Sequence, residues 1–201
     1  MRVRICDTEA RIRPNPQGDY PKIDKTAYID PSAVIIGKVK IGRDVFVAPG
    51  AVIRADEPKS FIRIGDNCNI QDRVVIHALA NTSVIIGQNT SLSHGCIVHG
   101  PCVIGKGCFI GFGSVIFKAK LENRVFVKFM AVVSGVNIPS RRVIPDGNVV
   151  DTAAKVKLLS AASGEFRKFS QRVLKANRNL LNGYRLENTD LASDSRSHSK
   201  K

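Results

Sequence analysis

The chain has little of what several common protein classes require. Tryptophan is absent from its 201 residues, and aromatic residues together make up only 6%. No stretch approaches eighteen consecutive apolar residues, and the N-terminal stretch contains no apolar signal segment. We therefore expect a soluble cytoplasmic protein without a membrane-spanning segment. Five cysteines are an odd number, which argues against a disulfide framework.

Four of these cysteines fit positions inside a folded core. Cys96, Cys102 and Cys108 recur at intervals of six residues, and Cys68 occupies an equivalent small-residue position. Successive members of such a series lie on successive faces of a coil, so they do not converge on one metal ion. We expect core thiols at these positions.

Aliphatic residues recur every six positions over most of the chain. This period is typical of a parallel β-helix, in which each hexad supplies one short strand and a turn, and three hexads close one coil. A β-sandwich with alternating strands is the alternative, but strict recurrence at six argues against it. The recurring residues are Ile29, Ile35, Ile41, Val47, Ile53, Ile64, Ile70, Ile76, Ile86, Leu92, Val98, Ile104, Ile110, Ile116, Leu121, Val127, Val133, Ile138, Ile144 and Val150.

Two insertions interrupt the period. Steps of eleven and ten residues replace the usual six, which places inserted loops at residues 57–61 and 80–83. Insertions in a repeat protein become loops on one face, and that face is often the binding face. Both loops flank His77 in the sequence.

Three of the four histidines lie within the repeat. The residues before His77 and His99 are three hexads apart when the looped step counts as one. His99 is therefore expected directly above His77, at the ~4.8 Å spacing of adjacent strands, with Arg54 directly beneath. His94 belongs to the preceding face, where Asp72 is expected below it.

Three neutral imidazoles form a common catalytic zinc site that leaves a fourth position for water. Two faces of one coil diverge, so His94 does not easily reach His77 and His99 within a single chain. Packing of three coils around a three-fold axis would bring the pair from one subunit to His94 of another. The alternative is three separate surface histidines on a β-helix.

The residues around the histidines resemble the γ-class carbonic anhydrases over about residues 20–150. The matching stretches are residues 53–57, 65–77 and 93–101, and they are closer to the archaeal enzyme and the carboxysome-shell branch than to generic hexapeptide proteins. The resemblance implies an all-β left-handed parallel β-helix with a C-terminal α-helix. It also implies a homotrimer that holds zinc, or else iron or cobalt, between its subunits.

The resemblance assigns roles to individual residues as well. It implies reversible hydration of carbon dioxide to bicarbonate, with the metal held by His77, His94 and His99. The residues implied at the subunit interface are Arg54 and Asp72, as a salt bridge, and Asp56, as a further charge.

Three more residues match catalytic positions of the family. Gln71 matches a residue that hydrogen-bonds the metal-bound hydroxide, Asn69 one that orients bicarbonate, and Glu57 the glutamate near the substrate. Glu57 is suited to carrying the proton that must leave the site. The alternatives are a solvated loop acid at Glu57 and turn-capping roles for the two amides.

The chain departs from the family in two places. The archaeal enzyme has a long acidic loop with a glutamate proton shuttle after its first histidine, whereas residues 78–83 form a short loop without an acid. Arg73 stands where the family often has glycine. Both departures favour a catalytically silent scaffold as the first alternative function. A hexapeptide acyltransferase, which uses a single histidine as a base, is the second.

The net charge of +14 is compatible with a polyanionic partner. However, basic and aromatic residues are not interleaved, and no nucleic-acid-binding motif is present. We therefore expect neither nucleic acid nor a membrane as a partner.

A helical period replaces the hexads after Val150. Asp151 and Thr152 are candidate N-caps, and an amphipathic helix is expected to follow, with Gly164 as a point of kinking or division. The resemblance implies an active-site asparagine from this helix, but the sequence alone does not assign it to Asn177, to Asn179 or to any other position. The expected apolar stripe is Leu159, Ala162, Phe166, Phe169, Val173, Ala176 and Leu180.

Four segments are therefore expected along the chain. They are a lead-in over residues 1–28, the β-helix over 29–150, the helix over 151–186 and a polar, disordered tail over 187–201.

Overall fold

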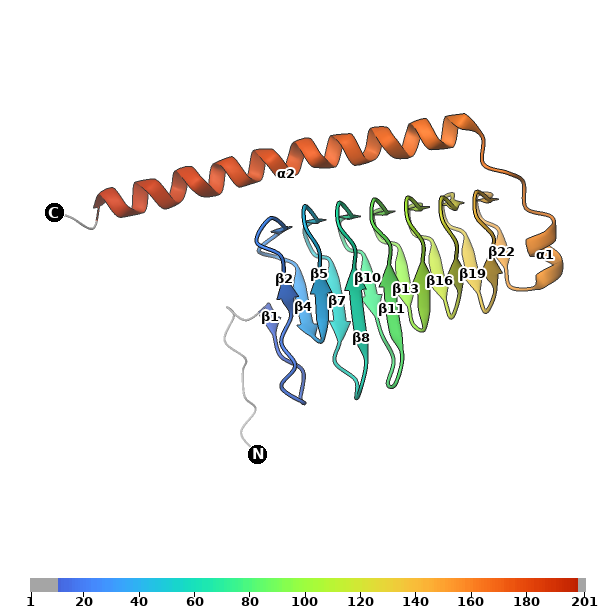
Figure 1. Cartoon of the computed structure of the whole chain (residues 1–201), viewed down its shortest axis with the longest axis horizontal. Helices are drawn as coiled ribbons and strands as arrows, with labels where there is room; N and C mark the ends of the chain where they lie inside the picture. Colours follow the sequence, from blue (N-terminus) through green and yellow to red (C-terminus); the bar gives the residue numbers. More distant parts are fainter. Residues whose placement is uncertain (1–10, 199–201) are drawn as a thin grey trace.

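The computed structural model describes the backbone of residues 11–198 and the side chains of residues 11–185. Its main body is a solenoid of short parallel strands, in which three parallel sheets form the three faces (Figure 1). The chain passes from one sheet to the next at each turn, so sequence neighbours lie on different faces. The predicted all-β parallel coil is confirmed.

Each sheet collects every third strand. Sheet A contains β1 Ile12–Arg13, β4 Val34–Gly37, β7 Val52–Ala55, β10 Val75–His77, β13 Ile97–His99, β16 Val115–Phe117, β19 Val132–Ser134 and β22 Val149–Val150. Sheet B contains β2 Lys22–Ile23, β5 Val39–Ile41, β8 Phe61–Ile64, β11 Ser83–Ile86, β14 Cys102–Ile104, β17 Lys120–Leu121 and β20 Asn137–Ile138. Sheet C contains β3 Tyr28–Ile29, β6 Phe46–Val47, β9 Asn69–Ile70, β12 Ser91–Leu92, β15 Phe109–Ile110, β18 Phe126–Val127 and β21 Val143–Ile144.

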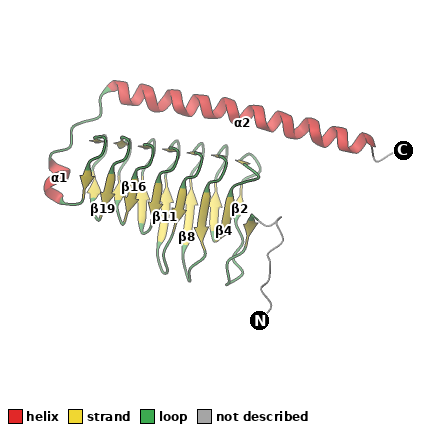
Figure 2. Cartoon of the chain, turned by 180° about the vertical axis from the view of Figure 1, so that it is seen from behind, coloured by secondary structure: helices red, strands yellow, loops and turns green. Residues whose placement is uncertain are grey.

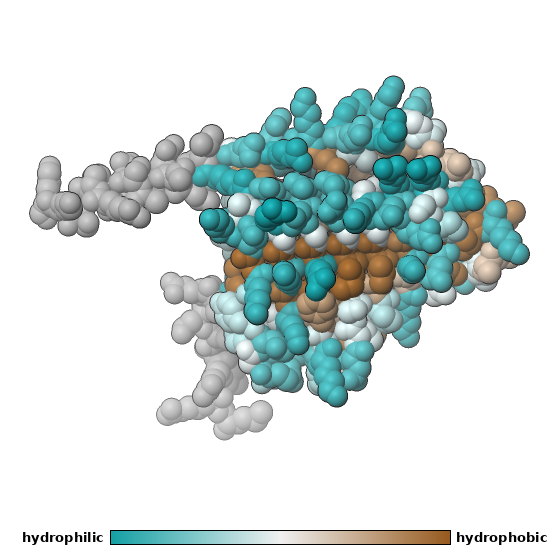
Figure 3. Space-filling view, viewed as in Figure 1, coloured by the Kyte–Doolittle hydropathy of each residue, from teal (hydrophilic) through white to brown (hydrophobic). Residues whose placement is uncertain are grey.

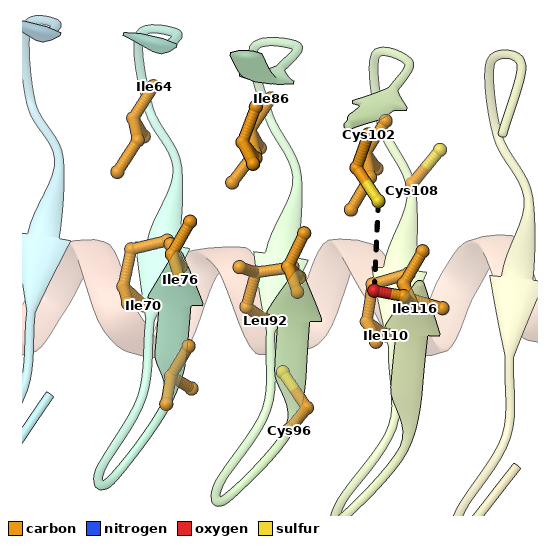
Figure 4. Close-up of a cluster of buried hydrophobic side chains, with 14 of the residues drawn as sticks. Ile64, Ile70, Ile76, Ile86, Leu92, Cys96, Cys102, Cys108, Ile110 and Ile116 are labelled. Atoms are coloured by element: carbon orange, nitrogen blue, oxygen red, sulfur yellow. Dashed lines mark hydrogen bonds between the residues drawn. The ribbon is translucent and has the colours of Figure 1, made fainter. Parts of the chain in front are cut away.

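The aliphatic residues of the hexads fill the interior of the solenoid. Ile53, Ile76 and Val98 stack in register through β7, β10 and β13, and all three are fully buried. Equivalent stacks line the other two sheets, so the interior is a continuous column of Ile, Val and Leu (Figure 4). Removal of this apolar surface from water is the main stabilising term of the fold.

The described cysteines belong to that interior, as predicted. Cys68, Cys96, Cys102 and Cys108 are buried free thiols, and Cys102 donates to the carbonyl of Ile116 at 3.7 Å (Figure 4). Burial raises the pKa of each thiol, to about 12 for Cys68 and about 11 for Cys108. Cys6 lies outside the described residues.

The coil begins earlier than the sequence analysis expected. Strands β1, β2 and β3 pair in register with β4, β5 and β6, so residues 12–29 already belong to the solenoid. The step from Ile12 to Ile23 is eleven residues, which resembles the looped step from Ile53 to Ile64. The expected lead-in is therefore mostly the first coil.

Two helices follow the solenoid, rather than one. Helix α1 spans Ala153–Lys157 and is capped by Thr152, whose side chain accepts from the amide of Lys155. Helix α2 spans Gly164–His198 and runs back along the solenoid, as the two opposite views show (Figures 1 and 2). Gly164 thus marks a division, and the backbone is helical beyond residue 186, where a disordered tail was expected.

The buried stripe of α2 differs in phase from the expected one. Phe166, Phe169 and Val173 pack against aromatic and aliphatic side chains of sheet C, as predicted. Further along, Asn177 and Leu181 are buried, whereas Ala176 and Leu180 are exposed. On the face seen in Figure 3, polar side chains predominate along the described part of the helix, and an apolar band runs along the solenoid below it.

Candidate metal centre

The first half of the candidate site lies at the carboxyl ends of β10 and β13, in the middle of sheet A. Strand pairing places His99 directly above His77 and Arg54 directly beneath, as the hexad count predicts. Nδ1 of His77 lies 3.2 Å from Nε2 of His99, and Nε2 of His77 lies 3.2 Å from the guanidinium of Arg54. These three residues, with Asp56 and Glu57, form the first half-site.

The contacts indicate which ring nitrogen of His77 carries a proton. A guanidinium only donates, so Nε2 of His77 accepts from Arg54, and Nδ1 of His77 carries the proton that faces His99. Burial, followed by the cation of Arg54 and the ring of His99, holds the pKa of His77 below its usual value. His77 is therefore neutral at neutral pH, which is the form that binds metals.

The inserted loops position Glu57 in the first half-site. The backbone N–H of Ala80, in the second inserted loop, donates to Oε2 of Glu57 at 2.7 Å. The other carboxylate oxygen lies 3.4 Å from Nε2 of His77, and Asp56 lies 3.6 Å from the same nitrogen. The short loop that lacks an acid thus fixes the acid of the preceding loop beside the imidazole.

The second half of the candidate site lies at the turn that follows the strands of sheet C. His94 is 50% exposed, and its Nδ1 donates to a carboxylate oxygen of Asp72 at 2.8 Å. With the proton at Nδ1, Nε2 is the ring nitrogen that faces away from Asp72 and can offer a lone pair to a metal ion. Asp72, His94 and the amides described next form the second half-site.

A cluster of amides completes the second half-site. The side-chain nitrogen of Gln71 donates to the side-chain oxygen of Asn69 and, at 2.6 Å, to that of Asn177 in α2. Asn177 in turn donates to the carbonyl of Val173 at 2.9 Å. The structure thus brings Asn177 to the cluster, while Asn179 is exposed.

Arg73 occupies the turn between these groups. Its φ is +57°, in the left-handed region that favours glycine, which explains why glycine suits this position. The side chain is exposed, and it lies over the backbone of Gly50 in the turn below.

Each half-site is incomplete within one chain. Among the described residues, no group of three His, Cys, Asp or Glu side chains is arranged to hold a metal ion. Within the part of the chain whose side chains are described, the buried side-chain atoms without a hydrogen-bond partner are Oδ1 of Asp56, Nδ2 of Asn69, Oγ of Ser91 and Nδ1 of His99. Ser91 pairs with Asn69 across adjacent strands, so all four atoms lie at or beside the half-sites. Unpaired buried polar atoms are costly and call for an explanation.

The residues present fit a divalent metal such as zinc. Two ring nitrogens bound to one tetrahedral zinc at about 2.0–2.1 Å lie about 3.3 Å apart. Nδ1 of His77 and Nε2 of His99 have this spacing, 3.2 Å, and an ion between them would require the Nδ1 proton of His77 to move to Nε2. His99 has a buried nitrogen without a partner, and His94 has a carboxylate on its second nitrogen, as metal-binding histidines commonly do.

Comparison with known proteins identifies the repeat and the family. Residues 20–55 and 83–118 match the family described as bacterial transferase hexapeptide (six repeats). The chain is 38% identical over 192 residues to a carbonic anhydrase from Methanosarcina thermophila, which covers 85% of this chain and 77% of that protein. It is 36% identical over 173 residues to the carboxysome assembly protein CcmM of a Nostoc species, covering 81% of this chain but only 31% of that protein. A putative acetyltransferase from Bacillus cereus has the same fold, with a TM-score of 0.75, 26% identity, and coverage of 86% and 95% of the two chains.

The parallel coil of short strands and its six-residue period define a hexapeptide-repeat protein. The extent of the sequence identity is more specific. The chain belongs to the γ-carbonic-anhydrase-like family. In the described part of the chain, no helix has the length and apolarity needed to cross a membrane.

Proposed function

We infer that the protein is a metal-dependent carbonic anhydrase whose two half-sites meet across the subunit contacts of a homotrimer. The observation that carries this proposal is the division of complementary groups between two faces of one chain. His77 and His99 lie on sheet A, whereas His94 and its orienting Asp72 follow sheet C. A three-fold arrangement supplies each pair with the third imidazole and gives three sites per trimer.

Zinc, or iron or cobalt, is the cofactor of this proposal. When bound, the metal ion supplies hydroxide near neutral pH, because it lowers the pKa of coordinated water from 15.7 to about 7. The ring nitrogens of His77 and His99, with Nε2 of His94 from the neighbouring subunit, would hold it. The substrates are carbon dioxide and bicarbonate.

The polar residues around the ligands have separate tasks in this mechanism. The amide of Gln71, fixed by Asn69 and Asn177, orients the attacking oxygen and the product by hydrogen bonds. Glu57 holds the departing proton at its carboxylate and passes it to buffer, because its position beside His77 places it at the site. Arg54 of one subunit and Asp72 of the next form the interface ion pair, with Asp56 nearby.

Mixed trimers test the divided site directly. We expect His94→Ala alone, and His77→Ala with His99→Ala, to be inactive as separate preparations. A trimer that contains both variants restores one site in three, because one subunit pair then combines intact half-sites. Random reassembly of equal amounts should give about 25% of wild-type activity, since about three quarters of the trimers are mixed. Stopped-flow hydration of carbon dioxide under anaerobic, metal-replete conditions, with metal content measured alongside, is the readout.

A silent scaffold is the second candidate function. The similarity to the carboxysome assembly protein and the acid-free loop over residues 78–83 favour it. It predicts trimers without hydration activity under the same conditions. Stoichiometric metal that is lost in His94→Ala would argue against an acyltransferase, which needs only one of the histidines.

A further inference from the structure

Two parallel ladders of side chains run along the solenoid and extend beyond the candidate metal ligands. The first ladder, on sheet A, is Arg54, His77, His99 and Phe117, and strand pairing places each residue directly above the one before. The ring centroids of His99 and Phe117 are 5.5 Å apart. A phenyl ring thus follows the two imidazoles, one coil further along.

The second ladder, beside sheet C, repeats this order of chemistry. It is Asp72, His94, Phe112 and Phe129, with 2.8 Å between Asp72 and His94 and 5.4 Å between the ring centroids of His94 and Phe112. Phe112 and Phe129 stack with centroids 4.6 Å apart and planes 8° apart. In both ladders a charged side chain is therefore followed by imidazole and then by phenyl rings, from earlier to later coils.

The outer phenyl rings of the second ladder lack cover within one chain. Phe112 is 43% exposed and Phe129 is 36% exposed. On the first ladder, the ammonium of Lys118 lies over the ring of Phe117 at 5.1 Å, so one side of that ring is already in contact. Neighbouring exposed aromatic rings on a small protein are typical of a contact surface.

The spacing of the two ladders fixes how they meet in a trimer. Asp72 precedes His77 by five residues, His94 precedes His99 by five, and Phe112 precedes Phe117 by five. A three-fold axis parallel to the solenoid leaves every residue at its own height. Joining His94 of one subunit to the imidazole pair of the next therefore sets all other rungs, at ~4.8 Å per coil.

We propose that Phe112 of one subunit packs against Phe117 of its neighbour, and that this aromatic contact forms the apolar wall of the metal site on the side of the later coils. This contact rests on the homotrimer of the proposed function. It defines an aromatic part of the interface between two copies of the chain. Asp72 and Arg54 bound the site on the opposite side. The metal site thus lies between a charged contact and an apolar one, and the phenyl rings exclude water next to an apolar substrate such as carbon dioxide.

Cross-linking tests the wall without any need for activity. In a Cys6→Ser background the remaining native thiols are buried, so introduced cysteines report alone. Phe112→Cys combined with Phe117→Cys should form disulfides between subunits under mild oxidation and give covalent dimers and trimers on non-reducing gels. Either single variant, and the mismatched pair Arg54→Cys with Phe112→Cys, should stay monomeric on the gel. Equal cross-linking of the mismatched pair, or none of the matched pair, would overturn the proposal.

Assembly provides a second test. We expect Phe112→Ala and Phe117→Ala each to raise the trimer dissociation constant at least tenfold in sedimentation velocity, and Phe112→Leu to restore most of the assembly. Phe61→Ala is the matched control, because Phe61 lies on sheet B, away from both ladders. Unchanged assembly in both alanine variants contradicts the wall. Cross-linking of the matched pair together with inactive wild-type protein keeps the wall and refutes only the catalytic function.

Discussion

The two half-sites of one chain are built differently. The His77 side chain in the first half-site is 13% exposed, and the sheet register places His99 above it and Arg54 beneath it. His94 in the second is 50% exposed, and its partners come from a turn and from α2. The first half-site is thus a product of strand stacking, whereas the second depends on contacts between elements far apart in the sequence.

This difference shows how many metal ligands one face of the repeat can supply. Equivalent positions on adjacent strands lie one coil apart, at ~4.8 Å, which suits two ligands to one metal but cannot supply a third from another face. In the proposed trimer, the exposed His94 supplies that third ligand to a neighbouring chain. We infer that exposure of the second half-site is a requirement of assembly rather than a defect in packing.

The largest expected effect comes from removing His94, the exposed histidine of the second half-site. His94→Ala should abolish stoichiometric metal binding and lower hydration activity more than 100-fold, beyond the 10–100-fold typical of residues that only orient a ligand. His198→Ala is the control, because it removes the histidine outside the repeat. Full metal content in the His94 variant would show that one chain binds the metal by itself.

An intermediate effect is expected from the carboxylate behind that ligand. Asp72→Asn keeps the shape of the side chain, but its charge and strong acceptor for the Nδ1–H of His94 are lost. We expect metal affinity to fall about 10–100-fold. Competition with a chelator measures this fall, and Asp44→Asn, which removes a carboxylate paired instead with Arg185, is the control. Unaltered affinity would mean that the turn alone orients the ring.

The first half-site was predictable from the sequence because it follows from counting. A strict period of six places His99 over His77 and Arg54 beneath, whatever the loops between them do. The same count failed for the first coil only because the eleven-residue step after Ile12 was not recognised as a looped hexad. The register itself needed no tertiary information.

The helix contribution to the second half-site was not predictable in the same way. The buried stripe of α2 continues from Val173 through Asn177 to Leu181, and a polar residue at its centre breaks the apolar pattern. Leu180, which fits an apolar stripe equally well, is exposed. Gln71 selects Asn177, and a contact across 106 positions leaves no local sequence signal.

That contact gives the third prediction. Asn177→Ala leaves the half-buried amide of Gln71 with one acceptor fewer, a loss of about 0.5–1.5 kcal/mol. We expect kcat/KM to fall several-fold while metal content stays constant. Asn179→Ala should change neither quantity, because Asn179 is exposed on the same helix turn. A similar loss in both variants would point to the helix as a whole and not to the amide cluster.

The smallest expected effect is on the reactivity of the buried thiols in the interior between the half-sites. Cys96 is buried in the same coil as His94 and His99, and burial raises the pKa of its thiol. Burial likewise raises the pKa of the Cys68 thiol, to about 12. A raised pKa keeps a thiol protonated, so at pH 8 only about one part in 10⁴ of Cys68 is thiolate. In a Cys6→Ser background we expect no alkylation by iodoacetamide in native protein, with or without chelator, and four modified thiols after denaturation, as counted by mass spectrometry. Rapid labelling of Cys96 after chelation alone would mean that the metal holds the coil closed, and that the two half-sites are not independent of the interior between them.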